Sequence, residues 1–114
     1  MNQTSVFTQA LTHAQERAAE QKAEQQRTAP VTFRIYTEYR SNLHELVARY
    51  FEGATLVYGL GIWHNTVEQA CTIEIVSTRN KLQAATFLAA DIKFVNRQSV
   101  VLLTETPCSV SIEI

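Results

Sequence analysis

The stretch that decides the fold is ATLVYGLGIWHNTVEQACTIEIVS, residues 54–77. Two apolar runs, residues 54–64 and 67–77, predict two β-strands. The interval His64-Asn65-Thr66 between them predicts a hairpin, because asparagine tolerates the positive φ that tight turns require. The first strand carries large apolar residues on both of its faces, so both sides of the resulting sheet need a cover.

Segments on either side of this hairpin complete the sheet. Residues 31–38 alternate, with Val31, Phe33 and Ile35 on one face and polar residues on the other, which predicts a half-buried strand. Residues 99–106 predict a final main strand. Residues 108–114 alternate again after Pro107 and predict a short terminal strand or a continuation.

Two helices are expected between the strands. The first begins near Asn42, which has the spacing of a capping box to Glu45, and ends where Gly53 supplies a left-handed residue. The second covers residues 80–96 and is capped by Asn80. Its predicted buried face consists of Leu82, Ala85, Leu88, Ala89, Ile92 and Val95.

A long helix is predicted for residues 4–27, and Pro30 ends it because proline disfavours helical conformation in the residue before it. Its first half carries an apolar stripe and its second half is almost entirely polar. We therefore expect residues 5–18 to dock on the domain or on a second subunit, and residues 19–28 to stay exposed.

After this N-terminal helix, the order of elements is strand, helix, strand, strand, helix, strand. Two β-α-β units with right-handed crossovers, interleaved in one antiparallel sheet, are the most economical packing of that order. The sequence therefore predicts an α+β fold, a ferredoxin-like split β-α-β sandwich whose first and third strands are central. Residues 1–29 form a helical extension and residues 30–114 form the domain.

Composition limits the class of protein. Hydrophobic residues make up 46% of the chain and charged residues 18%, which predicts a folded domain. Ten Lys and Arg against eleven Asp and Glu argue against a nucleic-acid partner. We expect no membrane association and no signal peptide, because no apolar run is long enough. Cys71 and Cys108 predict reduced thiols in the cytoplasm, with a disulfide as the alternative.

The face of the sheet opposite the helices gathers the groups that could carry chemistry. Arg34, Tyr36, Glu38 and Glu74 are expected near one another in mid-sheet, with His64 and Glu68 at the hairpin end. A cation, a phenol, carboxylates and an imidazole suit acid–base work or the binding of a polar ligand. The competing interpretation is structural: Arg34 forms a cross-strand ion pair with Glu74 or Glu38 inside a subunit interface.

Two further features could bind a ligand. Gly59 and Gly61 share a face with Trp63 and leave a groove for a ring, either a ligand or an aromatic side chain. The segment Arg79-Asn80-Lys81 could hold an anion at a helix N-terminus or form an ordinary solvated cap. No metal site and no cofactor are expected.

The sequence from about residue 31 to residue 114 resembles a family of small bacterial α+β proteins of unknown function. The resemblance rests on Gly-Leu-Gly-Ile-Trp at 59–63, Ile-Glu-Ile-Val at 73–76, Gln-Ser-Val-Val-Leu-Leu at 98–103 and Pro107-Cys108. It implies a ferredoxin-like fold and a dimer, and it assigns no catalytic residues.

Three functional hypotheses follow. The first is a non-enzymatic, homo-oligomeric interaction or regulatory module, dimeric or larger, of a bacterium or its phage, which could also bind another protein. The second is a small-molecule enzyme, a dimeric α+β barrel that uses Tyr36, Glu38 and His64. The third is a regulatory domain that holds an anion or nucleotide at a subunit interface.

Overall fold

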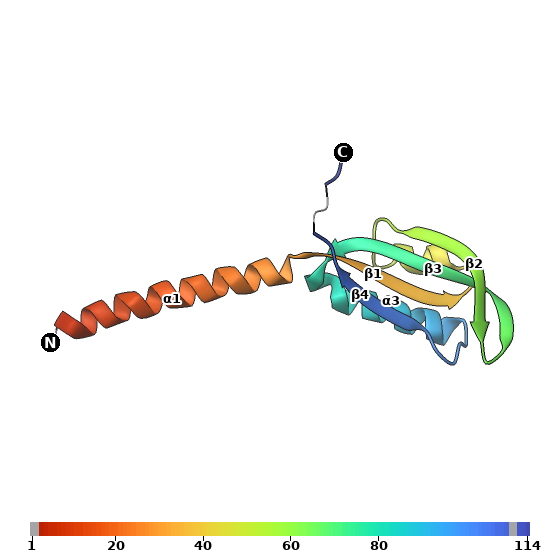
Figure 1. The fold of residues 1–114 in the computed structure, drawn as a ribbon, viewed down its shortest axis with the longest axis horizontal. Helices are drawn as coiled ribbons and strands as arrows, with labels where there is room; N and C mark the ends of the chain where they lie inside the picture. Colours follow the sequence, from red (N-terminus) through yellow and green to blue (C-terminus); the bar gives the residue numbers. More distant parts are fainter. Residues whose placement is uncertain (1–2, 110–111) are drawn as a thin grey trace.

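The computed structural model describes residues 3–109 and 112–114 and shows an α+β domain with a projecting helix (Figure 1). The elements are α1 (Gln3–Arg27), β1 (Pro30–Glu38), α2 (Leu43–Ala48), β2 (Thr55–Trp63), β3 (Thr66–Thr78), the 3-10 turn η1 (Arg79–Lys81), α3 (Leu82–Val95) and β4 (Leu102–Pro107). The expected α+β class is confirmed.

The four strands form one antiparallel sheet in the order β2-β3-β1-β4. The first and third strands are therefore central, as the sequence predicts. β1 pairs with β3 along its whole length, so that Arg34 lies opposite Glu74 and Tyr36 lies opposite Thr72.

One face of the sheet carries the core. Alternate residues of the central strands point to α2 and α3 and are almost completely buried, as the period of two in their sequences predicts. The core consists of Val31, Phe33, Ile35, Cys71, Ile73 and Ile75 from the sheet, with Leu43, Leu46, Val47, Ala85, Leu88, Ala89 and Ile92 from the helices.

The first predicted helix is shorter than expected. α2 ends at Ala48, and Gly53 does not have the positive φ that was predicted for it. Asn42 precedes the helix without making a side-chain capping bond. Its Nδ2 instead donates to Oδ1 of Asn96 at 2.7 Å, which ties the start of α2 to the end of α3.

The second predicted helix begins later than expected. Asn80 lies inside η1, and α3 proper begins at Leu82, so Asn80 does not cap it. The middle of the predicted buried face is confirmed, whereas Leu82 and Val95 at its two ends are exposed. The core lies only under the middle turns of this 14-residue helix.

The hairpin turn is tighter than the sequence suggests. β2 ends at Trp63 and β3 begins at Thr66, so the loop has two residues, not three. His64 and Asn65 both adopt positive φ, 47° and 66°, as a type I′ turn requires.

The C-terminal strand is also shorter than predicted, because β4 begins at Leu102. The backbone N–H of Cys108 donates to the carbonyl of Pro30 at 3.0 Å and extends the pairing by one bond. Residues 108–109 and 112–114 are not part of a strand. The rest of the predicted terminal strand, residues 110–111, lies outside the described residues.

Helix α1 extends away from the domain (Figure 1). All its side chains from Thr8 to Arg27 are exposed, and Val6 and Leu11 are 59% and 49% exposed. Residues 8–18 therefore do not dock on the domain of their own chain, contrary to one of the two expected placements. The stripe consists largely of alanines, which offer little apolar area. Within the described residues, no helix has both the length and the apolarity to cross a membrane.

Candidate functional site

The open face of the sheet, opposite α2 and α3, carries polar side chains along its two central strands. Arg34 Nε donates a hydrogen bond to Glu74 Oε1 at 2.8 Å, which also brings the charges into contact. The predicted ion pair between Arg34 and Glu74 is confirmed. Tyr36 and Thr72 follow as the next opposite pair on this face.

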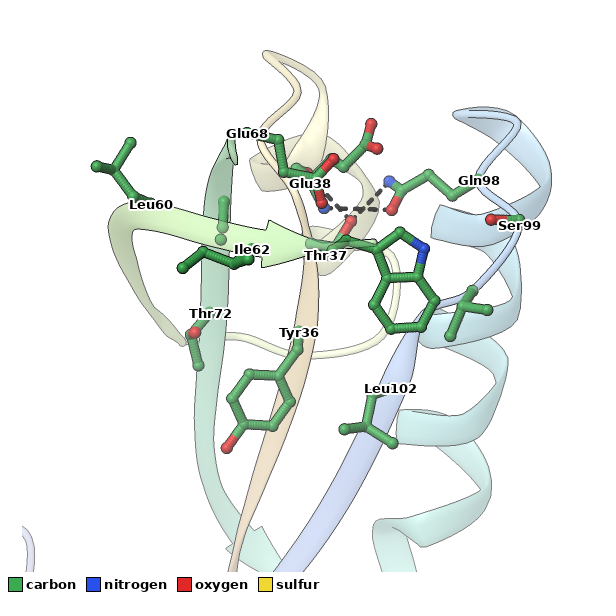
Figure 2. A pocket seen from close by; sticks show the side chains of 14 residues that line it. Tyr36, Thr37, Glu38, Leu60, Ile62, Glu68, Thr72, Gln98, Ser99 and Leu102 are labelled. Carbon is green, nitrogen blue, oxygen red and sulfur yellow. Dashed lines mark hydrogen bonds between the residues drawn. The ribbon is translucent and has the colours of Figure 1, made fainter. Parts of the chain in front are cut away.

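The carboxyl groups of Glu38 and Glu68 lie near each other at one end of the open face (Figure 2), and each influences the pKa of the other. Arg40 Nη2 donates to Glu38 Oε2 at 2.6 Å, and this bond lowers the pKa of Glu38. The hydrogen bond to Glu38 raises the pKa of Glu68. The pair therefore favours the ionised form of Glu38 and the protonated form of Glu68.

Gln98, in the connection between α3 and β4, anchors the end of β1. Its Nε2 donates to Thr37 Oγ1 at 2.6 Å, and its Oε1 accepts from the backbone N–H of Glu38 at 3.2 Å (Figure 2). One end of the amide therefore binds the Thr37 hydroxyl and the other binds the backbone of Glu38. Sequence reasoning missed this role, since 60 residues separate Gln98 from Glu38 and no spacing pattern links them.

A hollow of about 390 Å³ opens beside the carboxyl pair. This volume lies in the usual range of small-molecule sites, about 300–1,000 Å³. Its wall is polar at one end and apolar over most of the rest. Its lining includes Tyr36, Glu38, Leu60, Gly61, Ile62, Trp63, Glu68, Ala70, Gln98, Val100 and Leu102.

The hollow exists because the end of the hairpin curls over the open face. Trp63 ends β2 and Leu102 begins β4, and these are the two edge strands. In a flat sheet, three strand spacings would separate the edge strands by about 14 Å. Trp63 and Leu102 nevertheless line the same hollow, and Figure 2 shows β2 crossing in front of β1.

The two glycines of β2 contribute differently to this shape. Gly61 lines the hollow, and a Cβ added to it would lie 3.1 Å from the Cβ of Ala70. Gly59 has open space where its Cβ would be and does not line the hollow. The groove predicted beside Trp63 is therefore present at Gly61, whereas Gly59 lines a separate hollow with Tyr39 and Tyr58.

The structure brings together four of the residues singled out in the sequence. Tyr36, Glu38, Trp63 and Glu68 all line the hollow, and the pair Arg34–Glu74 lies further along the same face. His64 does not line the hollow. Its ring packs edge-on against Trp63, with centroids 4.8 Å apart, at the first position of the turn.

The chemistry available in the hollow is that of a proton donor beside a proton acceptor. Glu68 and Glu38 fill these roles because their environments move their pKa values apart. Among residues 3–109 and 112–114, no three His, Cys, Asp or Glu side chains gather as a metal site. Cys71 lies in the core, where burial raises the pKa of its thiol.

No family model matches the sequence, and no curated protein matches it. The structure is similar to a DUF3240 family protein from Shewanella baltica OS155, with a TM-score of 0.58 and 10% identity, over 76% of this chain and 98% of that chain. A de novo designed protein, Foldit4, matches with a TM-score of 0.42 and 16% identity, over 70% and 97% of the two chains, which is too low to carry an argument.

The similarity to the DUF3240 family protein shows the fold alone, because the sequences are 10% identical. It agrees with the expected resemblance to small bacterial α+β proteins of unknown function. The 76% of the chain that matches leaves room for a segment such as α1 outside the shared fold.

Proposed function

We propose that this protein is a non-enzymatic, homo-oligomeric interaction or regulatory module. The observation that carries the proposal is the apolar surface of the hairpin. Leu60 and Ile62 are 77% and 78% exposed, and Val57, Tyr58, Trp63 and Val67 next to them are at least half exposed. These side chains lie on both faces of the hairpin. Soluble monomers rarely expose so much apolar surface on one element, and a subunit interface would cover part of it.

The proposal includes a ferredoxin-like arrangement of the domain. The element order after α1 supports it, since it reads β-α-β-β-α-β. The strand order supports it too, because β1 and β3 are the central strands. The proposal also includes a cytoplasmic protein of a bacterium or its phage. The thiol of Cys71, which is buried and not part of a disulfide, supports the compartment.

A second candidate function is a small-molecule site, catalytic or regulatory, on the open face. The carboxyl pair favours it, because one group with a raised pKa and one with a lowered pKa are what proton transfer needs. In this reading, two copies place their open faces around the hollow as a dimeric α+β barrel. His64 is not part of this proposed site, because it does not line the hollow.

The test of the first function is the mass of the full-length protein in solution. Light scattering at increasing micromolar concentrations should give at least twice the chain mass of 12.9 kDa. A mass that stays at 12.9 kDa over the whole range would overturn the proposal.

The second function is tested with the variants Glu38→Gln and Tyr36→Phe. If these residues belong to a ligand site, both variants should keep the wild-type mass and should lose the binding of any ligand found by screening.

A further inference from the structure

β2 is an edge strand without the protection that edge strands usually have. Its sequence, TLVYGLGIW, contains no charged residue and no proline over nine residues. Native proteins normally blunt an exposed edge with lysine, proline or a bulge, because its unpaired backbone groups invite another strand. Within the described residues, β2 pairs with β3 alone.

The hairpin turn determines which backbone groups of β2 face outward. In a hairpin with a two-residue loop, the residues flanking the loop, Trp63 and Thr66, form a hydrogen-bonded pair. Hydrogen-bonded and non-hydrogen-bonded pairs then alternate along the ladder. The outward N–H and C=O groups therefore belong to the even-numbered residues, Leu56, Tyr58, Leu60 and Ile62.

We propose that β2 pairs antiparallel with β2 of a second copy, across a two-fold axis that passes beside Gly59. This inference rests on the proposed homo-oligomer and specifies its interface. Gly59 is the middle residue of Thr55–Trp63, so this register uses the entire strand. It sets Tyr58 opposite the partner's Leu60 and Leu56 opposite the partner's Ile62. All of these have outward backbone groups, which gives on the order of eight new hydrogen bonds.

Side-chain sizes favour the same register. On the open face it sets Val57 opposite the partner's Gly61, and Trp63 opposite the partner's Thr55. A large side chain thus lies beside a small one at both of these positions, and Gly59 lies opposite its own copy. A shift of one residue would pair outward with inward backbone groups, and a shift of the axis to Tyr58, to Leu60 or further along the strand would shorten the ladder.

Charge and area are also compatible with a second copy. β2 is uncharged, so two copies meet without repulsion. Five of the apolar side chains on β2 are at least half exposed. Pairing along the edge covers the flanks of these side chains and the outward backbone groups of both copies, so it removes apolar area from water and forms hydrogen bonds at the same time.

Beside Gly59 the two-fold axis lies perpendicular to the hairpin, so the hairpins of the two copies join into one four-stranded ribbon. The partner's Thr55 would lie next to Trp63, at the rim of the hollow. Each hollow is then bordered by both subunits. This edge-to-edge dimer is an alternative to the face-to-face barrel of the second candidate function, because β2 and not the open face makes the contact.

Two glycines of the chain make a matched cross-linking experiment possible. A Cβ fits without a close contact at both Gly59 and Gly53, but only Gly59 would face its own copy. In a non-hydrogen-bonded antiparallel pair the Cα atoms are about 4.5 Å apart, within the range of disulfides. Under mild oxidation, full-length Gly59→Cys in a Cys108→Ser background should become mostly a covalent dimer, and Gly53→Cys in the same background should not. Cys71 is buried and does not compete.

A second variant tests the strand without a new bond. Leu60→Lys places a charge at the centre of the edge, and the exposed position leaves the fold intact. It should reduce the mass measured by light scattering to that of one chain. Phe94→Lys, at an 84% exposed position on α3, is the control and should keep the wild-type mass.

The outcomes separate this inference from the function it rests on. An oligomeric wild type in which Gly59→Cys fails to cross-link, or cross-links no better than Gly53→Cys, overturns the β2 interface and leaves the homo-oligomer standing. If Leu60→Lys remains an oligomer, the β2 interface is likewise overturned and the homo-oligomer stands. A monomeric wild type overturns both, and a strand of a different protein would then be the occupant of the edge.

Discussion

The ion pair between Arg34 and Glu74 joins the two central strands on the open face. The two side chains remain 33% and 38% exposed, so water screens their attraction. The hydrogen bond from Arg34 to Glu74 raises the pKa of Arg34, and the guanidinium stays charged at any physiological pH. The pair therefore contributes to pairing specificity more than to stability.

Replacing Arg34 alone should lower Tm more than replacing Arg34 and Glu74 together. Arg34→Ala leaves Glu74 without its cation in the middle of the sheet, so we expect a small fall in Tm. Arg34→Ala combined with Glu74→Ala should recover part of that fall. Thermal unfolding of the wild type, both single variants and the double variant measures the coupling. A double variant whose loss equals the sum of the single losses would show that the pair is not coupled.

The carboxyl pair makes stability depend on pH in two directions. The folded protein holds the Glu68 proton more tightly than the unfolded chain does. Its contribution is therefore complete below the ordinary glutamate pKa and is lost as the pH rises through the raised pKa. The contribution of Glu38 is complete above the ordinary pKa and is lost as the pH falls through the lowered pKa.

Replacing Glu68 should remove the first of these dependences. Glutamine is neutral at every pH and can still donate a hydrogen bond to Glu38. In the wild type, Tm should fall as Glu68 loses its proton at a pH just above the ordinary glutamate pKa of about 4.3, and in Glu68→Gln this fall should be absent. Calorimetry over the pH range that begins at about 4.3 and extends upward measures the slope. Glu52→Gln, at an exposed position, is the control and should follow the wild type. Identical slopes for Glu68→Gln and the wild type would contradict the shared proton.

Within β2, the two glycines should respond in opposite ways to alanine. Gly61→Ala brings a Cβ to 3.1 Å from Ala70 and should destabilise the domain by about 1 kcal/mol, at the low end of overpacking costs. Gly59→Ala meets no atom within 4 Å and should stabilise it by about 0.5 kcal/mol, because it restricts the unfolded chain. Denaturant unfolding compares the two, and equal changes would show that the contact at Gly61 is harmless.

Strands could be predicted from the sequence because a period of two needs only local information, as in Val31, Phe33 and Ile35. Helix ends could not. Asn42 has the residue type and spacing of a cap, but its amide finds Asn96, 54 residues away. The candidate site could be predicted only where it depends on the alternation of residues along a strand. The parity of β1 and β3 places Tyr36 and Glu68 on one face, whereas the curl that brings Trp63 to Leu102 has no sequence pattern.

Helix α1 should be dispensable for the stability of the domain. Deleting residues 1–28 removes no buried described side chain, so the free energy of unfolding at low protein concentration should change by less than about 0.5 kcal/mol. Deleting residues 1–29 also removes the Ala29 carbonyl, which accepts from the Arg79 N–H at 3.0 Å, and should cost about 1 kcal/mol more. Chemical denaturation of both truncations measures the difference. A large loss on removing residues 1–28 would show that α1 supports the domain.

The molecule as a whole is elongated, with extents of 74 × 34 × 26 Å and a radius of gyration of 20.9 Å. A compact chain of this length has a radius of gyration of about 13 Å. Most of the difference comes from α1, whose 25 residues span about 37 Å.

That projecting helix also governs how the protein moves through water. Friction increases with the longest dimension, so the chain diffuses slowly for its 12.9 kDa and leaves a sizing column ahead of compact proteins of equal mass. A single copy can thus elute where a compact dimer would. The apparent mass taken from the elution volume alone would then be that of a dimer, although the protein is a monomer. Removing α1 separates shape from assembly, because it shortens the particle and leaves β2 in place to pair.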